Sequence, residues 1–198
     1  KIPGTFQHSL QVANLAEEAC YKIGGNALLV RTGAMYHDIG KINNARFFTE
    51  NQVGEVSPHE DLTSEESAKI IINHVISGVE IAKENKLPET IIDFIRTHHG
   101  TTTTRFFLHN YKKEHEGQLI NEDLFRYPGP IPFSKETAIL MMADSVEASS
   151  RSLKKYDAVG IDELVDRIIN HQISENQFIN SDITFRDINQ IKKIFEEN

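Results

Sequence analysis

The sequence has a single cysteine and no long hydrophobic run, and both absences narrow what the chain can be. Because Cys20 stands alone, no disulfide can form within the chain, and a reducing compartment is compatible with it. Cys20 lies in a helical-looking stretch, where we expect a small buried hydrophobe. No uninterrupted apolar run reaches the roughly 18 to 20 residues that span a bilayer, and no signal-peptide pattern opens the chain. We therefore expect a soluble segment that makes no membrane contact itself.

A block of five or more basic residues is also missing, and the formal net charge is -8. Long nucleic acids and anionic membrane surfaces attract proteins through clustered Lys and Arg. Neither is therefore expected as a partner of this chain. An anionic substrate would need positive charge supplied locally.

The 198 residues, 39% of them hydrophobic, can bury a sizeable core as one large domain or two small ones. We expect one domain over residues 1–198. The chain opens at Lys1 without a methionine, so we also expect it to be excised from a longer protein.

Apolar spacing indicates helices nearly everywhere, and no repeat, low-complexity tract or strand pattern is visible. We expect helices between the Pro3-Gly4 and Gly24-Gly25 pairs, then at about 27–38, 64–85, 88–99, 135–153, 161–176 and 184–196. Several starts carry a capping signal: Thr63 with Glu66, Ser134, and Thr184 with Asp187. The sum is an all-α helical bundle.

Two segments lack this periodicity. Residues 43–62 are expected to be loop. Residues 101–133 end in "FRYPGPIP" and are long for a passive connection, which predicts an irregular segment that forms a lid or a pocket wall.

Seven potential metal donors fall on apolar helices or their ends: His8, His37, Asp38, His74, His98, His99 and Asp144. One such histidine would usually be a core residue bonded to a carbonyl. Burying all seven without a cation would demand many separate hydrogen-bond networks, whereas one shared metal centre satisfies them together. Imidazole with carboxylate suits iron, manganese, zinc or cobalt, and the absence of cysteine ligands argues against a structural zinc site. Seven donors exceed the needs of one ion, so we expect two.

The two adjacent pairs pose a geometric problem, because neighbouring helical residues diverge by about 100°. At a helix end His37 could bind one ion while Asp38 lies between the two. By the same reasoning we expect His98 to be a ligand and His99 to be either a ligand or a phosphate contact.

The order of these seven residues resembles the metal-binding pattern of the HD-domain phosphohydrolase superfamily, and "HDIGK" at 37–41 resembles its HDIG branch. The strings "HSLQVANLAEEA", "FFTENQ", "HHGTTT", "FRYPGPIP" and "ADSVEASSRS" are similar to the cytosolic HD domain of the seven-transmembrane HD family. Characterised members of that family hydrolyse cyclic di-AMP to linear pApA. The resemblance covers residues 4 to 195, and the "GYP" element of cyclic di-GMP phosphodiesterases is missing.

The resemblance implies an HD-domain helical bundle that acts as a cyclic dinucleotide phosphodiesterase, in the cytoplasm, within a parent protein anchored in the cell membrane. It implies two divalent metal ions, iron or manganese, that activate a hydroxide for attack on phosphorus. One ion would be held by His8, His37, Asp38 and Asp144, and the other by Asp38, His74 and His98, with His99 as a further candidate ligand.

Around that centre we expect Asp38, Lys41 and His99 to be catalytic, and Lys41, His99, Arg126 and Tyr127 to bind substrate. Each has a second interpretation. Lys41 could orient Asp38 or be a solvated lysine at a helix end, and Arg126 could merely brace its loop. Tyr127 and Phe107 could stack on adenine or pack internally. The remaining histidines, His59, His109, His115 and His171, are expected on the surface.

Three alternatives stay open at this point. The first is an HD hydrolase of another nucleotide, such as pApA, a nucleoside monophosphate or a (p)ppGpp-like alarmone. The second is a di-iron oxygenase, and the third a non-catalytic sensor domain. An oligomer is compatible with the sequence.

Overall fold

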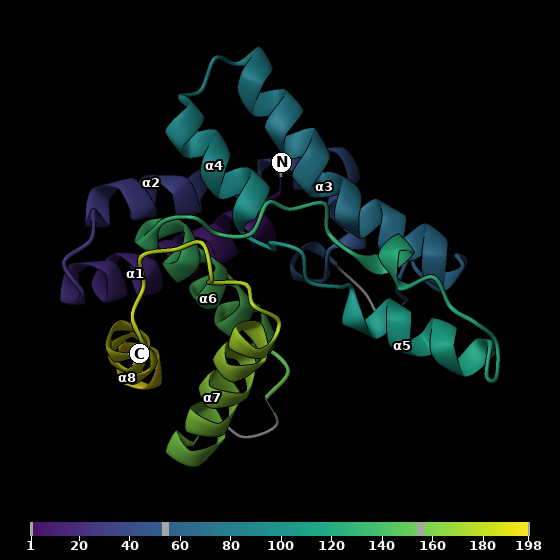
Figure 1. The fold of residues 1–198 in the computed structure, drawn as a ribbon. Coiled ribbons are helices and arrows are strands. Elements are labelled where there is room, and N and C mark those ends of the chain that lie inside the picture. The colour runs from purple at the N-terminus through teal and green to yellow at the C-terminus, as the bar shows by residue number, and fades with distance from the viewer. Residues whose placement is uncertain (1, 53–55, 154–156, 198) are drawn as a thin grey trace.

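The computed structural model describes residues 2–52, 56–153 and 157–197, and this part of the chain is helical without any strand (Figure 1). An isolated antiparallel bridge joins Thr103 and Arg126. The α-helices are α1 (Pro3–Lys22), α2 (Ala27–Tyr36), α3 (Ser64–Glu84), α4 (Glu89–Thr97), α5 (Arg105–Glu114), α6 (Lys135–Ser150), α7 (Ala158–Ser174) and α8 (Phe185–Glu197). The 3₁₀ helices are η1 (Ile39–Phe47), η2 (Thr49–Asn51) and η3 (Glu122–Phe125). The predicted all-α class is confirmed.

The main hydrophobic core, called the large core below, lies among α1, α2, α6, α7 and α8 and includes Phe94 of α4. Helix α1 packs against α2, α6 and α8, and α6 packs against α7. Fully buried members include Val12, Val30, Ile139, Met142 and Ile191. Each such side chain stabilises the fold by about 1.5–3 kcal/mol relative to exposure.

Two smaller clusters, called the small clusters below, hold α3 to its neighbours. Ala68, Leu108 and Phe125 join α3 to α5 and η3. Ala82, Ile92 and Ile95 join α3 to α4. In Figure 1, α3 and α5 extend to one side, away from α7 and α8 at the lower end.

The predicted helix starts are confirmed where a local capping signal exists. Thr63 and Glu66 form a reciprocal capping box at the start of α3. The Ser134 hydroxyl accepts from the Thr137 backbone at the start of α6. Before α8, Thr184 and Asp187 bond each other's backbone N–H. These bonds satisfy amide donors that a helix start leaves unpaired.

Two loop predictions are partly wrong. Residues 39–47 and 49–51 form η1 and η2, which the expected loop at 43–62 overlaps. The segment expected to be irregular, 101–133, contains α5 and η3. Helix α5 buries only Leu108, and its place depends on contact with α3.

A very close backbone approach places η1 against α3. A Cβ built on Gly40 would lie 1.8 Å from the carbonyl oxygen of His74 and 2.5 Å from the amide nitrogen of Gly78. Only glycine fits such an approach. The contact holds the segment after Asp38 beside the turn of α3 that carries His74.

Cys20 is fully buried in the large core, as predicted. Burial raises the pKa of its thiol to about 12, so it stays protonated and unreactive. Among the described residues, no helix combines the length and apolar character needed to cross a membrane.

Candidate metal centre

The seven predicted donor residues lie together, although they come from five different helices or helix ends. His8 belongs to α1, His74 to α3 and Asp144 to α6. The doublet of His37 and Asp38 follows α2, and His98 with His99 follows α4. All except His99 are almost fully buried, and the His99 side chain is 23% exposed.

Asp38 stands between two sets of imidazoles and presents one oxygen to each. Its Oδ2 lies 3.4 Å from Nε2 of His8 and 3.3 Å from Nε2 of His37. Its Oδ1 lies 3.4 Å from Nε2 of His74 and 3.6 Å from Nε2 of His98. Each set thus shares the same carboxylate.

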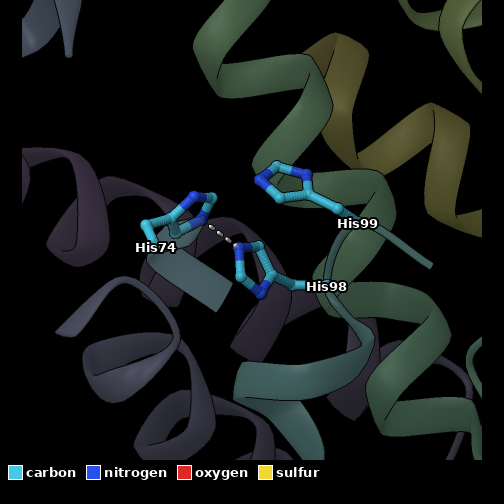
Figure 2. Close-up of side chains that lie close together, drawn as sticks. All are labelled: His74, His98 and His99. Atoms are coloured by element: carbon cyan, nitrogen blue, oxygen red, sulfur yellow. Dashed lines mark hydrogen bonds between the residues drawn. The ribbon is translucent and has the colours of Figure 1, made fainter. Parts of the chain in front are cut away.

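Asp144 completes the set around His8 and His37, called the first half below. Its Oδ1 lies 2.9 Å from Nε2 of His8 and 3.5 Å from Nε2 of His37. The second half consists of His74, His98 and His99, whose rings converge in Figure 2. Three groups have ligand atoms within 4.8 Å of one another, close enough for a shared cation: His74 with His98 and His99, His8 with His37 and Asp38, and His37 with His98 and Asp144.

The ends of α2 and α4 explain how adjacent residues can serve one site. Helix α2 ends at Tyr36, and Asp38 leaves the helical path with φ -101° and ψ 14°. Helix α4 ends at Thr97, and Gly100 takes φ +51°, a conformation that favours glycine. His37 and His98 keep helical backbone angles at these C-caps, and Asp38 and His99 are the first residues beyond them.

The hydrogen bonds of the imidazoles test whether a cation fits. Nδ1 of His37, His74 and His98 each donates to a backbone carbonyl three residues earlier, those of Ala34, Ile71 and Ile95. In the neutral rings Nε2 then carries no proton. Yet Nε2 of His74 and Nε2 of His98 lie only 3.1 Å apart, drawn as the dashed line in Figure 2. Two lone pairs at this distance require a cation or a proton between them.

Further buried atoms lack partners within the described residues. Nε2 of His37 and both carboxylate oxygens of Asp38 are buried without a hydrogen bond, although Oδ2 of Asp38 forms an ion pair with Lys41. Buried polar atoms are rarely left so, and an ion is one recognised reason. The donor set therefore fits divalent cations.

The charges at the centre agree with this fit. Burial alone would raise the pKa of Asp38, but His37 and Lys41 hold it well below its usual range. The pKa of Asp144 is likewise held well below its usual range by His37 and His8, although burial alone would raise it. Burial lowers the pKa of His99 to about 3, so this ring is neutral at physiological pH. Burial lowers the pKa of His8 and His37, but the neighbouring carboxylates raise it to about 9 and about 10, so both rings carry a proton that a bound cation would replace. Two ionised carboxylates thus face positive charge in a buried space.

Lys41 is buried rather than solvated, so the interpretation as a solvated lysine is wrong. Its Nζ lies 2.7 Å from Oδ2 of Asp38 and 2.8 Å from Oε1 of Glu50. The pairing orients the Asp38 carboxylate. Sequence reasoning missed Glu50, whose position in the chain carries no spacing signal. Thr5 also donates to Glu50, which ties α1 to this pair.

A second carboxylate, Glu147, was also missed. It contacts Nδ1 of His8 and is itself bonded by Arg151. A sequence signal did exist, because Glu147 lies three residues after Asp144 and shares its helix face.

The predicted substrate contacts lie beside the second half. Tyr127 is buried and stacks on His99, with ring centroids 4.2 Å apart. Arg126 donates from Nη1 to the Thr101 carbonyl at 2.7 Å, so it braces the loop after His99. Phe107 packs against the cluster of Leu108 and Phe125.

Two further residues, Gln177 and His59, lie near the segments that carry these predicted substrate contacts. The buried Gln177 bonds both the amide nitrogen and the hydroxyl of Thr101, each at 3.0 Å. His59 was expected on the surface, but its ring is half-buried between Phe47 and Phe107. The turn at 58–61 folds it inward, where Nε2 meets the Phe47 carbonyl.

The other histidines stand apart from the centre. His109 is exposed, as predicted, and His115 and His171 are partly exposed.

Residues 5–149 match the family model of the HD domain. The chain belongs to the HD domain family. HD domains bind divalent metals, and the His and Asp groups described above are able to hold them.

Known relatives agree with the family. The chain is 44% identical over 193 residues to cyclic-di-AMP phosphodiesterase PgpH of Bacillus subtilis (strain 168), and 45% identical over 192 residues to its counterpart in Listeria monocytogenes serotype 1/2a (strain 10403S). These matches cover 98% and 97% of this chain but 27% and 26% of the relatives. The chain thus spans about a quarter of the length of the curated relatives it matches.

A solved structure is similar over the whole chain. It is the crystal structure of the L. monocytogenes phosphodiesterase PgpH HD domain in complex with cyclic-di-AMP, with a TM-score of 0.96 and 44% identity. The match covers 100% of this chain and 91% of that one. The predicted resemblance to the HD phosphodiesterases is confirmed.

Proposed function

We propose that this HD domain is a metal-dependent phosphodiesterase that hydrolyses cyclic di-AMP to linear pApA. The observation that carries the proposal is the Asp38 carboxylate, which presents one oxygen to each half of a buried His and Asp cluster. The chain is also 44% identical to a cyclic-di-AMP phosphodiesterase over nearly all of its length.

Two divalent ions, iron or manganese, are proposed at the centre. His8, His37, Asp38 and Asp144 would hold one, and Asp38, His74, His98 and His99 the other. When bound, such ions neutralise phosphodiester charge and lower the pKa of water, which supplies a nucleophile at neutral pH. Mixed nitrogen and oxygen donors suit both metals.

The protein side chains around the ions have separate roles. Lys41 holds the Asp38 carboxylate through its ion pair and keeps it oriented between the halves. We propose this as its main role, with contact to a substrate phosphate secondary, because its ammonium already binds two carboxylates.

His99 and its neighbours would meet the substrate. His99 is the most exposed of the seven donors, at 23% of its side chain, so substrate approaches on its side. Tyr127 stacks on the ring and fixes its plane. Arg126 keeps 38% of its side chain exposed beside its bond to Thr101 and could meet the second phosphate there.

A small dinucleotide suits the electrostatics of this chain better than a long nucleic acid. The net charge is -8, without a basic block to track a polymer backbone. The ions and Arg126, whose Nε lies 3.5 Å from Oδ1 of Asp123, would supply local positive charge for two phosphates.

The test is anaerobic incubation of the protein with cyclic di-AMP and Mn²⁺ in ¹⁸O-water. We expect pApA with one ¹⁸O in its terminal phosphate, because water supplies the new oxygen. Asp38→Ala should be inactive, whereas His109→Ala, an exposed substitution far from the centre, should match the unmodified chain. Absence of pApA, or turnover only when oxygen is admitted, would contradict the proposal. If pApA, a nucleoside monophosphate or (p)ppGpp is turned over faster than cyclic di-AMP in the same assay, that nucleotide is the substrate instead.

We further propose that the segment is one catalytic domain of a longer protein, held on the cytoplasmic side of a membrane by other parts. The span of about a quarter of its relatives supports this. Fractionation of the full gene product should place pApA-forming activity in the membrane pellet, accessible only from the cytoplasmic face. Activity confined to the soluble fraction would contradict it.

A further inference from the structure

Four buried imidazoles of the metal centre are oriented in two different ways. His37, His74 and His98 are held through Nδ1 by carbonyls of the backbone just before them. His8 is held instead by a side chain of another helix, because its Nδ1 contacts Oε2 of Glu147 on α6. Among these four rings, His8 alone has an Nδ1 partner that one side-chain substitution outside the donor set can remove.

Glu147 is itself held in place. Nη2 of Arg151 lies 2.7 Å from Oε1 and 2.9 Å from Oε2 of Glu147. The Glu147 side chain is 12% exposed and that of Arg151 is 37% exposed. A chain of contacts therefore runs from the surface through Glu147 to His8.

Helix α6 supplies both the opposing ligand and this support. Asp144, Glu147 and Arg151 follow one another at spacings of three and four residues, so they share one face. Asp144 meets Nε2 of His8 at 2.9 Å, while Glu147 meets Nδ1. The His8 ring is thus fixed at both nitrogens by one helix.

We propose that Glu147 is a positioning residue for His8, and that Arg151 acts through Glu147. A carboxylate that accepts the Nδ1 proton leaves the Nε2 lone pair directed at the ion and makes the ring a stronger donor. The inference rests on the two-ion centre of the proposed function. It predicts a selective effect, because the second half has its own backbone anchors.

The experiment titrates the metal-free chain with Mn²⁺ and follows binding by calorimetry and by electron paramagnetic resonance. The unmodified chain should bind two ions and show an exchange-coupled pair. Glu147→Leu should weaken one of the two affinities by about 10–100-fold and leave the other unchanged. At limiting Mn²⁺ its spectrum should be that of an isolated ion.

Further variants separate the effect of the Glu147 charge from that of its hydrogen bond to His8, and test whether Arg151 acts through Glu147. Glu147→Gln keeps an acceptor without the charge and should lose less affinity than Glu147→Leu. Arg151→Ala should also lose less, and it should add nothing when combined with Glu147→Leu. Glu18→Leu is the matched control, because Glu18 is exposed and lines the same groove as Glu147 without being near His8. It should bind both ions normally.

Two results would overturn the inference: full affinity for both ions in Glu147→Leu, or equal weakening of both. If circular dichroism shows that Glu147→Leu is unfolded, Glu147→Gln and Arg151→Ala are judged by the same selective loss. A chain that binds two ions but makes no pApA contradicts the proposed substrate and leaves the positioning role standing. If the unmodified chain binds fewer than two Mn²⁺ ions, the proposed two-ion function and the positioning role of Glu147 are both contradicted.

Discussion

The two halves of the metal centre rest on very different parts of the fold. The first half comes from α1, the end of α2 and α6, which are packed in the large core. The second half comes from α3, which the small clusters hold, and from the end of α4, which contributes Ile92 and Ile95 to a small cluster and Phe94 to the large core. Regions with fewer buried apolar contacts open at lower free energy than the main core. We therefore expect the first half to form a stiffer wall of the site and the second half a softer one. Asp38 lies between these two walls.

The softer wall is also where the substrate is expected. His99, Tyr127 and Arg126 all belong to it or to the loop beside it. A wall that opens at low cost can admit a ligand while the other keeps its donors fixed. The following predictions probe this contrast, from the largest expected effect to the smallest.

Gly40→Ala should separate the two walls. Its Cβ would meet the His74 carbonyl at 1.8 Å, so η1 and α3 must move apart. We expect a loss of more than about 3 kcal/mol in the free energy of unfolding, since overpacking costs about 1–3 kcal/mol even where side chains can yield. Binding of the second ion should be lost as well. Urea denaturation and Mn²⁺ titration measure both effects.

Gly117→Ala is the control for this prediction. Gly117 has a positive φ, +81°, and its Cβ would meet nothing within 4 Å. It should cost only about 1–2 kcal/mol of backbone strain and leave Mn²⁺ binding unchanged. Two bound ions in Gly40→Ala would show that the close approach does not set the site.

Leu140→Ala and Phe125→Ala should differ in where the fold loosens. Each removes a fully buried side chain, at a cost of about 2–5 kcal/mol. Leu140 belongs to the large core, so hydrogen exchange should accelerate throughout the chain. Phe125 belongs to a small cluster, so exchange should accelerate first in α5 and η3. Uniform acceleration in both variants would remove the distinction between the walls.

Mn²⁺ should stabilise the chain by about 2.7 kcal/mol at one hundred times its dissociation constant, because it binds only the folded state. The gain in hydrogen-exchange protection should be greater in α3 and α4 than in α1 and α6. Chelator should reverse it. Asp38→Ala should show no gain, since both halves share that carboxylate. A gain confined to α1 and α6 would contradict the contrast.

Asp187→Ala should have the smallest effect, at the start of α8 far from the centre. Burial raises the pKa of Asp187, but the backbone and hydroxyl of Thr184, together with Lys135, lower it below the ordinary 3.8. The stabilisation is therefore present above that ordinary value and is lost as pH falls through the lowered pKa. We expect a cost of about 1 kcal/mol at neutral pH that shrinks in acid, measured by urea denaturation across pH. A cost independent of pH would exclude the ionised cap.

The sequence predicts best what depends on nearby residues. The capping pairs at Thr63 and Thr184 need only a spacing of three, and both are present. Helix α5 was missed within a segment expected to be irregular, and its contact with α3, which fixes its place, is reported by no local pattern.

The donor set shows the same division. Seven donors in apolar surroundings could be picked out from the chain alone, and the structure brings them together, although their ligation stays a prediction. Glu50 could not be foreseen, because its approach to Lys41 depends on how η1 and η2 fold. The roles of Lys41 and Arg126 likewise needed the partners that tertiary structure supplies.

The bonds from Gln177 to Thr101 give the C-terminal part of the chain a share in the centre. The family match ends at residue 149, whereas Gln177 lies between α7 and α8 and holds the residue that follows Gly100. The unit that must be inherited, transplanted or redesigned as a whole is therefore longer than the matched family region. A chimera joined at the end of α6 would keep every metal donor and still lose the brace behind its histidine pair.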